Sequence, residues 1–425
     1  MKMRSESKIR MDLNSKVLVI AILGMIVMFS TSLLPIQLVL TDLQPANTDY
    51  IYMVDDWIIT ENTVLTNDVV FAQGKGIIIS ASDIVLDGAG HSISAEVYGY
   101  GTGIKIYAQE NVVVKNLEIF NFEYGIRIRE SDNCLILNNN IHHNKKYNIE
   151  ISRGACFNVF KNNIIAYADD EGIHISGRYW QTYGASEGNV LMNNYFYENK
   201  VEHIYLLVAV GTVIIHNTLQ GGGTGVYVKC SNDTIIRDNI FIETGIELRA
   251  DVVYGEYYNV ERTKIIGNRF KGGGIKLNSR VTQVIDTVII DNELIDANDG
   301  IRLIGGKGSI IMHNKISGGN YGIRLETQTK YAPRFNSTDN KIVNNEIVEC
   351  TDSGIILMEG DQDNNEIINN KVLNNGKYGI YVSNYANGNR IVSNTARGNG
   401  IYDLYDWSLG IENTWIANKY DTANW

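Results

Sequence analysis

The sequence is poor in the residues that stiffen or cross-link a chain. Only three of its 425 residues are proline, so it contains no long, rigid proline-rich linker. Four cysteines are too few for a disulfide framework and match no zinc-ligand spacing, so we expect buried free thiols at Cys134, Cys156, Cys230 and Cys350. Lys and Arg number 37 against 48 Asp and Glu, and the net charge of −11 argues against a nucleic-acid-binding protein.

Long apolar runs are also absent, except near the N-terminus. There the basic segment 1–16 precedes an uncharged stretch, 17–41. This stretch exceeds the roughly 7–15 residues of a signal-peptide core and is long enough for a membrane span of about 20 residues. We expect a hydrophobic helix that is either a membrane anchor or a cleaved signal peptide. The basic flank stays in the cytoplasm in both cases, which makes the rest of the chain extracytoplasmic.

What the sequence does contain is a repeat. Short strands such as "GIKIY", "GIRIR", "GIHIS" and "GIRLE" begin at residues 103, 125, 148, 172, 203, 225, 245, 274, 300, 322, 354 and 379. A second signature, such as "NNNI", "DNIF" or "NNEI", lies between them. The starts are 20 to 32 residues apart, a spacing typical of solenoids.

The repeat predicts an all-β fold, because apolar and polar residues alternate along each short strand. Such strands bury their apolar face only when coils stack on one another. We therefore predict a parallel β-helix of about 12–13 coils over 60–425, after a linker at 42–59. The segment "DIVLDGAGHSIS" (83–94) and the coil before it are the predicted N-terminal cap, and the tryptophans of 402–425 the predicted C-terminal closure. One turn is expected to hold a structural ladder of Asn139, Asn163, Asn194, Asn217, Asn239, Asn268, Asn292, Asn314, Asn345 and Asn370.

The segments "DIVLDGAGHSIS" and "NVVVKNLEIFNFEYGIRI" (111–128), with the repeats after them, resemble a known family. The chain is similar to right-handed parallel β-helix proteins of the pectate-lyase-like superfamily, above all to NosD-type proteins, over residues 60 to 420. The resemblance implies a right-handed coil and a carbohydrate-facing role. The Gly-His-Gly, Arg-Ile-Lys and Asp-Pro-His-Asp motifs of enzymes with this fold are absent, so it indicates no particular enzyme.

Outward positions of the Gly-Ile strands predict two columns on one face of the solenoid, with coils about 4.8 Å apart. Lys and Arg outnumber acids eight to three in these columns. Either the columns bind a polyanion such as a uronic-acid polymer, or they are an ordinary solvated sheet face. The binding candidates among them are Arg127, Arg129, Lys229, Arg249, Lys276, Arg302, Arg324 and Tyr227.

Four coils are longer than the rest, and their extra residues follow the Gly-Ile strand, so they should leave one edge of the solenoid. The insertions are 177–188, 250–263, 279–287 and 327–339. Three of them carry aromatics, which either form a wall for sugar rings or pack the loops onto the coils. The candidates are Tyr179, Trp180, Tyr183 and Tyr257.

Chemistry is predicted around the coil that begins at Gly172, where an acidic turn precedes the strand and an aromatic insertion follows it. The catalytic candidates are His174, Tyr205, Glu150, Asp169 and Asp170. In a lyase or epimerase, Arg127 and Arg129 would neutralise the uronate carboxylate while His174 or Tyr205 removes the proton. Alternatively, paired carboxylates hydrolyse a glycosidic bond, bind Ca²⁺, or form a solvated turn. No other metal site is predicted.

These patterns favour an extracytoplasmic protein that binds or acts on an acidic polysaccharide, as a binding protein or as a lyase, C5-epimerase or glycosidase. If 17–41 is not cleaved, the membrane is a second partner. The alternative is a non-enzymatic structural or envelope solenoid. Whether the protein is an enzyme is left open by the sequence.

Overall fold

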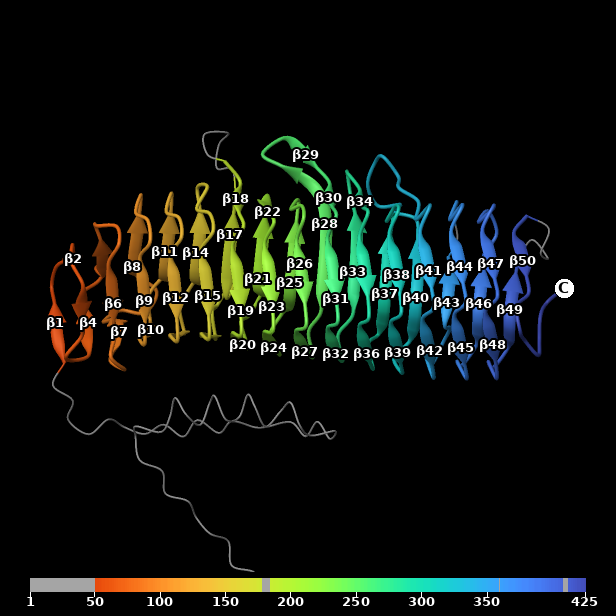
Figure 1. Ribbon diagram of the computed structural model, residues 1–425, viewed down its shortest axis with the longest axis horizontal. Helices are drawn as coiled ribbons and strands as arrows, with labels where there is room; N and C mark the ends of the chain where they lie inside the picture. The colour runs from red at the N-terminus through yellow and green to blue at the C-terminus, as the bar shows by residue number, and fades with distance from the viewer. Residues whose placement is uncertain (1–49, 178–183, 359, 408–411) are drawn as a thin grey trace, which may run out of the picture. The chain divides into compact units, whose positions relative to one another are not determined.

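The computed structural model describes residues 50–177, 184–358, 360–407 and 412–425. From Ile51 onward the chain winds into a right-handed parallel β-solenoid in which each turn contributes one short strand to each of three parallel sheets. Figure 1 shows these turns stacked side by side from the N-terminal to the C-terminal end of the solenoid. The all-β fold and the right-handed coil are therefore confirmed.

The first sheet, sheet A, contains fifteen strands. They are β1 (Ile51–Met53), β4 (Val69–Phe71), β7 (Ser92–Ala95), β10 (Glu118–Phe120), β13 (Asn140–His142), β16 (Ile164–Ala166), β20 (Tyr195–Tyr197), β24 (Thr218–Gln220), β27 (Ile240–Ile242), β32 (Arg269–Lys271), β36 (Glu293–Ile295), β39 (Lys315–Ser317), β42 (Glu346–Val348), β45 (Lys371–Leu373) and β48 (Thr395–Arg397).

Sheet B contains the Gly-Ile strands. Its members are β2 (Trp57–Ile59), β5 (Ile77–Ile79), β8 (Thr102–Tyr107), β11 (Tyr124–Arg129), β14 (Tyr147–Ser152), β17 (Ile173–Ser176), β21 (Glu202–Leu207), β25 (Thr224–Lys229), β28 (Ile246–Val253), β33 (Ile275–Ser279), β37 (Asp299–Ile304), β40 (Tyr321–Glu326), β43 (Ile355–Leu357), β46 (Tyr378–Val382) and β49 (Tyr402–Asp406).

Sheet C precedes the asparagine turn in each coil. Its members are β3 (Thr63–Val64), β6 (Val85–Asp87), β9 (Val113–Lys115), β12 (Leu135–Leu137), β15 (Val159–Lys161), β19 (Val190–Met192), β23 (Val213–Ile215), β26 (Ile235–Arg237), β31 (Lys264–Ile266), β35 (Val288–Ile290), β38 (Ile310–Met312), β41 (Lys341–Val343), β44 (Glu366–Ile368), β47 (Arg390–Val392) and β50 (Thr414–Ile416). Two short parallel pairs, β18 (Ser186–Glu187) with β22 (Ala209–Val210) and β30 (Val260–Glu261) with β34 (Val284–Ile285), lie beside the insertions, and β29 (Glu256–Tyr258) pairs antiparallel with β28.

The solenoid has about fifteen coils, more than the 12–13 predicted. The twelve recognised strands are all in sheet B, and the three that were missed are β2, β5 and β49. Of these, β2 and β49 lack the Gly-Ile start, whereas β5 follows Gly76 and begins with Ile77. Both β1 and β2 fall within 42–59, the segment interpreted as a linker.

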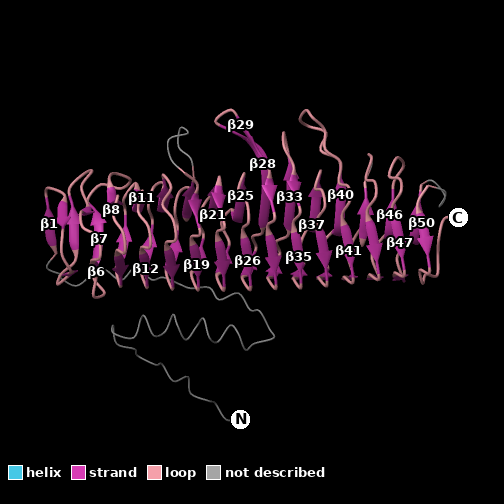
Figure 2. Ribbon diagram, turned by 45° about the horizontal axis from the view of Figure 1, so that its top comes forward, coloured by secondary structure: helices cyan, strands magenta, loops and turns pink. Residues whose placement is uncertain are grey.

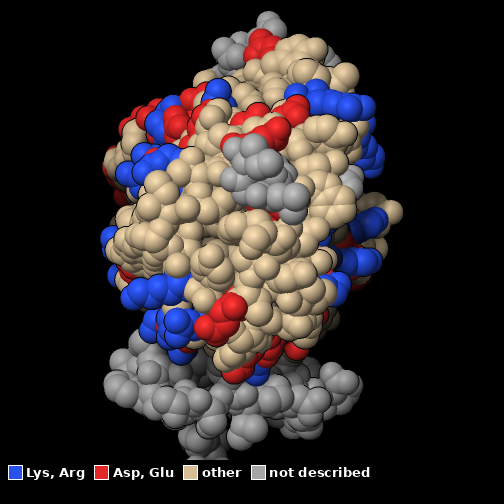
Figure 3. Space-filling model, turned by 90° about the vertical axis from the view of Figure 1, so that its right-hand side faces the viewer, with Lys and Arg blue, Asp and Glu red and all other residues tan. Residues whose placement is uncertain are grey.

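The predicted N-terminal cap lies inside the solenoid, whereas the predicted C-terminal segment 402–425 lies at its end and places Trp415 against the core. The segment 83–94 forms β6 and β7, which pair with coils on both sides and are therefore no cap. At the other end, β49 and β50 continue the repeat for one more coil. Trp415 packs against the core there and contacts Trp425, whereas Trp407 is exposed. Seen from this end, positive and negative side chains are mixed around the rim of the solenoid (Figure 3).

The core consists of in-register columns of apolar side chains that run the length of the solenoid. Ile104, Ile126 and Ile149 are fully buried and lie opposite one another in sheet B. The rings of Phe241 and Phe270 stack at 4.5 Å in sheet A. Each coil thus covers the apolar face of the next, which a single coil cannot do.

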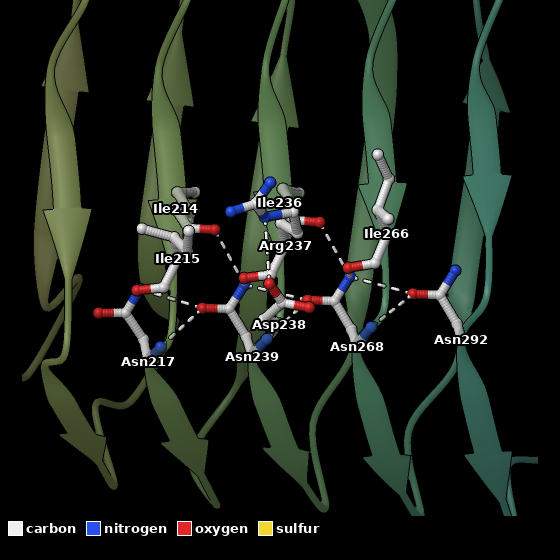
Figure 4. Close-up of polar contacts among 10 residues, drawn as sticks. All are labelled: Ile214, Ile215, Asn217, Ile236, Arg237, Asp238, Asn239, Ile266, Asn268 and Asn292. Carbon is white, nitrogen blue, oxygen red and sulfur yellow. Dashed lines mark hydrogen bonds and ion pairs between the residues drawn. The ribbon is translucent and has the colours of Figure 1, made fainter.

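The predicted asparagine ladder is confirmed in the turn between sheets C and A (Figure 4). Asn239 donates its Nδ2 to Oδ1 of Asn268, and Asn268 donates in the same way to Asn292, each at 3.0 Å. The same amide nitrogens also donate to strand carbonyls. The row extends through Asn394 to Asn418, beyond the ten residues predicted. Every member is buried or half-buried and hydrogen-bonded through its side-chain amide, so the ladder is part of the scaffold.

The insertions leave one edge, as predicted, because each lies between a sheet B strand and the following sheet C strand. In Figures 1 and 2 the β28–β29 hairpin and the loop between β40 and β41 project on the same side.

All four cysteines are free thiols, three buried and Cys156 half-buried. No helix in the described part of the chain is long and apolar enough to span a membrane, and the segment 17–41 lies outside the described residues.

Candidate functional site

The two outward columns of sheet B are in register, but they do not form a free positive strip. Glu150 accepts hydrogen bonds from Arg127 and, at 3.1 Å, from Arg129. Arg249 contacts Asp251 at 2.9 Å and Lys276 contacts Glu247 at 3.5 Å. The sequence count of charges along the columns omitted acids such as Asp251, which lies beside the columns. The strip predicted to neutralise a polyanion is therefore already largely neutralised.

The same pairing continues toward the C-terminal coils. Arg302 and Arg324 both contact Asp299 and Glu326, with Arg302 at 2.8 Å from Glu326. Of the predicted cations, Lys229 alone forms no ion pair with a described residue. Because a paired arginine must lose its partner before it binds a ligand carboxylate, the columns are weaker anion sites than the sequence suggested.

The aromatic candidates of the insertions differ in how exposed their rings are and in whether the structure describes them. Tyr179, Trp180 and Tyr183 lie outside the described residues. Tyr257 is 71% exposed in the β28–β29 hairpin, whereas Tyr331 in the next aromatic insertion is covered by the guanidinium of Arg280 at 3.9 Å. A continuous wall of free rings is therefore absent from the described insertions.

A stack of four rings lies on the outward face of sheet B instead. His174 lies between Tyr147, at 4.5 Å between ring centroids, and Tyr205, at 5.0 Å, and Tyr227 follows Tyr205 at 5.4 Å. The rings are nearly parallel and lie on successive coils, so the inner rings present their edges outward and cover one another's faces. The stack is therefore no platform for sugar faces.

The chemistry of Tyr205 differs from the prediction. Burial, reinforced by Tyr227 and nearby carboxylates, raises the pKa of Tyr205 well above its ordinary value. A phenol with a raised pKa stays protonated at neutral pH, so it can donate a proton or hydrogen bond but is a poor base. Burial also raises the pKa of Tyr227 to about 12, although Arg249 donates to its hydroxyl at 2.8 Å.

Three carboxylates come together in the turn between sheets A and B. One oxygen each of Asp170, Glu171 and Glu202 lies within 4.8 Å of the others. Glu171 and Glu202 face each other on adjacent coils, because Ile173 pairs with Ile204. We call Asp170, Glu171 and Glu202 the acidic group. Asp169 is not part of it, because its carboxylate accepts a hydrogen bond from the Tyr98 hydroxyl at 2.7 Å.

The carboxylates of the acidic group repel one another. Burial, together with the charges of Glu171, Asp170 and Glu247, raises the pKa of Glu202 to about 7. Burial and the neighbouring Glu171 also raise the pKa of Asp170. Oε2 of Glu171 and Nδ1 of His174 are buried without a hydrogen-bond partner among the described residues, and Nδ1 lies 3.6 Å from Oε1 of Glu171. Buried polar atoms without a hydrogen-bond partner are rare in folded proteins, and these two indicate a binding site for a ligand atom.

An open hollow of about 530 Å³ adjoins the acidic group. It crosses the coils of β21, β25, β28 and β33. Its charged lining residues are Lys200, Glu202, Glu247 and Lys276, with Thr224, Thr244 and several glycines between them. Small-molecule pockets are more enclosed and more apolar than this, so the hollow suits a polar, extended ligand.

Sequence reasoning missed Glu202, Tyr147 and Glu247 as site residues. The first two occupy a third position of the repeat, directly before the Gly-Ile pair or its equivalent, as Glu171 does. A signal for this was present, because "EGIHI" and "EHIYL" place two glutamates at equivalent positions of adjacent coils.

The described residues thus form a right-handed parallel β-helix with one acidic, partly unsatisfied site in a turn. A right-handed β-helix family model accordingly matches residues 252–396. A second model, periplasmic copper-binding protein (NosD), matches residues 56–274, more than half of the chain, and the chain belongs to this family.

Solved structures with the same kind of fold act on polysaccharides. The A-module of the Azotobacter vinelandii mannuronan C-5 epimerase AlgE6 is 12% identical over 85% of this chain and 91% of its own, with a TM-score of 0.47. An alginate lyase from Paenibacillus sp. str. FPU-7 is 17% identical over 56% and 88%, with a TM-score of 0.38. The periplasmic alginate epimerase AlgG is 12% identical over 84% and 78%, with a TM-score of 0.39. At these identities the likeness concerns the fold. No curated protein matches the chain.

Copper, the metal in the family's description, does not fit the chemistry of the acidic group. Among the described residues, the one group of three or more His, Cys, Asp or Glu side chains close enough to share an ion is the acidic group. Copper(I) selects thiolate and thioether ligands and copper(II) favours imidazole, whereas carboxylates suit hard cations. Burial raises the pKa of Cys134 to about 11 and that of Cys350 to about 12, so these thiols stay protonated at neutral pH.

Proposed function

We propose that this protein is an extracytoplasmic polysaccharide-binding protein and that its ligand lies along the turn between sheets A and B and the adjoining outward positions of sheet B. The observation that carries the proposal is the open, polar hollow across four successive coils. At the coil spacing of about 4.8 Å it extends about 14 Å along the solenoid, a length suited to several units of an extended polymer. The family's periplasmic description and the basic-then-apolar N-terminal sequence support the location.

The lining of the hollow fits a polyhydroxylated chain. Carboxylates of Glu202 and Glu247 can accept hydrogen bonds from sugar hydroxyls, and the ammonium groups of Lys200 and Lys276 can donate to sugar oxygens. Since both charge signs are present, the hollow itself selects for hydroxyl-rich ligands and not for one charge.

An acidic polysaccharide and a lyase or C5-epimerase reaction remain the narrower form of the proposal. A uronate carboxylate would have to compete with Glu150 for Arg127 and Arg129. His174, and not Tyr205, is the candidate base, because a neutral imidazole can accept a proton while the phenol of Tyr205 stays protonated.

A glycan panel with neutral and uronate polymers tests binding, and ultraviolet absorbance of unsaturated uronates tests elimination. We expect retention on at least one polymer, and at least a tenfold loss of affinity in the Glu247→Ala, Lys276→Ala double variant. The matched control is Glu346→Ala, Lys371→Ala, which removes an exposed ion pair from sheet A and should bind normally. If no polymer is retained, or if the double variant binds like the wild type, the proposal is wrong.

A second candidate, a structural or envelope solenoid without a glycan ligand, is favoured by the ion pairing of the outward columns. Satisfied charges on a sheet face keep the protein soluble without any ligand. The glycan panel separates the two functions, because the structural protein retains no polymer.

A further inference from the structure

We propose that Asp170, Glu171 and Glu202 bind a hard divalent cation, Ca²⁺, in the turn between sheets A and B. The site takes a metal of a different class from the copper in the family's description. It shares Glu202 with the hollow of the polysaccharide proposal, but it is tested separately because it concerns the ion alone.

The three ligands converge from two coils. Asp170 and Glu171 precede β17 and Glu202 begins β21, so the parallel register of these strands fixes the distance between the turns. One carboxylate oxygen from each residue lies within 4.8 Å of the other two. Oxygens at this separation can share one ion, because Ca²⁺ lies about 2.3–2.6 Å from each ligand oxygen.

A second observation points to a bound ligand. Glu171 is only 7% exposed, yet its Oε2 has no hydrogen-bond partner among the described residues. A buried carboxylate oxygen without a donor costs free energy, and a cation removes that cost.

The surrounding charges leave the acidic group uncompensated. None of the three acids forms an ion pair with a described lysine or arginine, whereas Glu150, one coil away, is held by two arginines. The nearby ammonium of Lys146 lies over the rings of Tyr124 and Tyr147, at 5.5 and 4.9 Å. The imidazole Nδ1 of His174 lies 3.6 Å from Oε1 of Glu171.

The donor set selects the ion. Three carboxylates supply up to six oxygens, and Ca²⁺ takes six to eight in a flexible arrangement that water completes. Mg²⁺ demands a near-ideal octahedron and gives up its water reluctantly, so we expect it to bind more weakly.

Isothermal titration calorimetry of the chelator-treated full chain with CaCl₂ tests the site. We expect one Ca²⁺ per chain, with affinity at least tenfold weaker in Glu171→Gln, Glu202→Gln and Asp170→Asn. The control Glu293→Gln changes an exposed acid of sheet A and should bind as the wild type does. Circular dichroism verifies that each variant is folded. Absence of calcium binding in the wild type, or unchanged affinity in the folded variants, overturns the proposal.

The choice of ion is tested by competition. Anaerobic Cu⁺ at equal concentration is expected to leave calcium binding unchanged. If Cu⁺ instead displaces Ca²⁺ from the wild type, and the Glu171→Gln variant no longer binds Cu⁺, the assignment to a hard cation is wrong. No glycan is present in these titrations, so a failure here leaves the polysaccharide proposal standing, and a failed glycan panel leaves the calcium site standing.

Discussion

Two rows of polar residues occupy turns of the same solenoid in opposite surroundings. In the asparagine ladder between sheets C and A, each amide has a partner on the next coil and a strand carbonyl besides. In the acidic group between sheets A and B, like charges face each other across coils and Glu171 keeps an oxygen without a donor. A row of polar residues is scaffold where its hydrogen bonds are complete, and a candidate site where they are not.

Asp403 shows that burial alone does not make an acidic residue a candidate site. It is 1% exposed, but its carboxylate accepts hydrogen bonds from Asn399 and from the backbone of Asp421 and Thr422. Burial alone would raise the pKa of Asp403, but these donors outweigh burial and hold the pKa below its ordinary value. No described residue donates such hydrogen bonds to the acidic group, and the pKa values of Asp170 and Glu202 are raised instead.

The largest effect is expected from breaking the ladder at its centre. Asn268→Ala removes bonds to Asn239, Asn292 and a strand carbonyl and leaves buried groups without partners. We expect a loss of about 3–5 kcal/mol in the free energy of unfolding, measured by urea denaturation. Asn162→Gly, at an exposed turn position with positive φ, is the control and should cost little. Equal losses in the two variants would contradict the scaffold role.

A smaller loss is expected for Asp403→Asn. Both oxygens of Asp403 accept hydrogen bonds from N–H groups, so the new amide NH₂ must face a donor wherever it points. We expect destabilisation by about 2–3 kcal/mol in the same assay. Asp421→Asn, whose side chain is 63% exposed, should change little. A stable Asp403→Asn variant would remove the contrast with the acidic group.

The pH dependence of stability sharpens the same contrast. Because the folded pKa of Asp403 lies below the unfolded value of 3.8, its stabilisation is complete above that value and is lost as the pH falls through the folded pKa. Urea denaturation at about pH 5 and about pH 3 should therefore show a smaller decrease for Asp403→Asn than for the wild type. Identical decreases would show that Asp403 has an ordinary pKa.

The smallest effect, and one of opposite sign, is expected at the acidic group. In the presence of a chelator, Glu171→Gln removes one of the facing charges and should stabilise the protein by up to about 1 kcal/mol. Glu293→Gln instead loses an exposed pair with Arg269 and should be neutral or slightly destabilised. Thermal denaturation of both variants gives the comparison, and a clearly destabilised Glu171→Gln would mean that the carboxylate is structural.

The scaffold was predictable because it repeats. Inward isoleucines and turn asparagines recur in nearly every coil, and stacking requires both. The coils of β2 and β49 were missed because their strands bury apolar residues without a glycine at the start, whereas β5 carries the Gly76-Ile77 pair in a continuous apolar run without the alternation. A strand needs an alternating pattern, and the Gly-Ile pair is a feature of only some coils.

The site was less predictable because it depends on contacts between columns. His174, Tyr205 and Asp170 were found near one another, yet Glu202 was missed because it occupies a different repeat position. The positive columns were misjudged because Asp251 and Asp299 approach them from neighbouring positions. Repeat spacing gives the coil of a residue, whereas its charge partner depends on side-chain direction.

The asparagine ladder has a direction. Along the row from Asn139 to Asn418, each amide donates toward the C-terminal end and accepts from the N-terminal side. The amide dipoles are therefore aligned head to tail, and aligned hydrogen bonds polarise one another. The ladder makes the turn an electrically polar axis, with its positive end toward the last coil, built entirely from uncharged side chains.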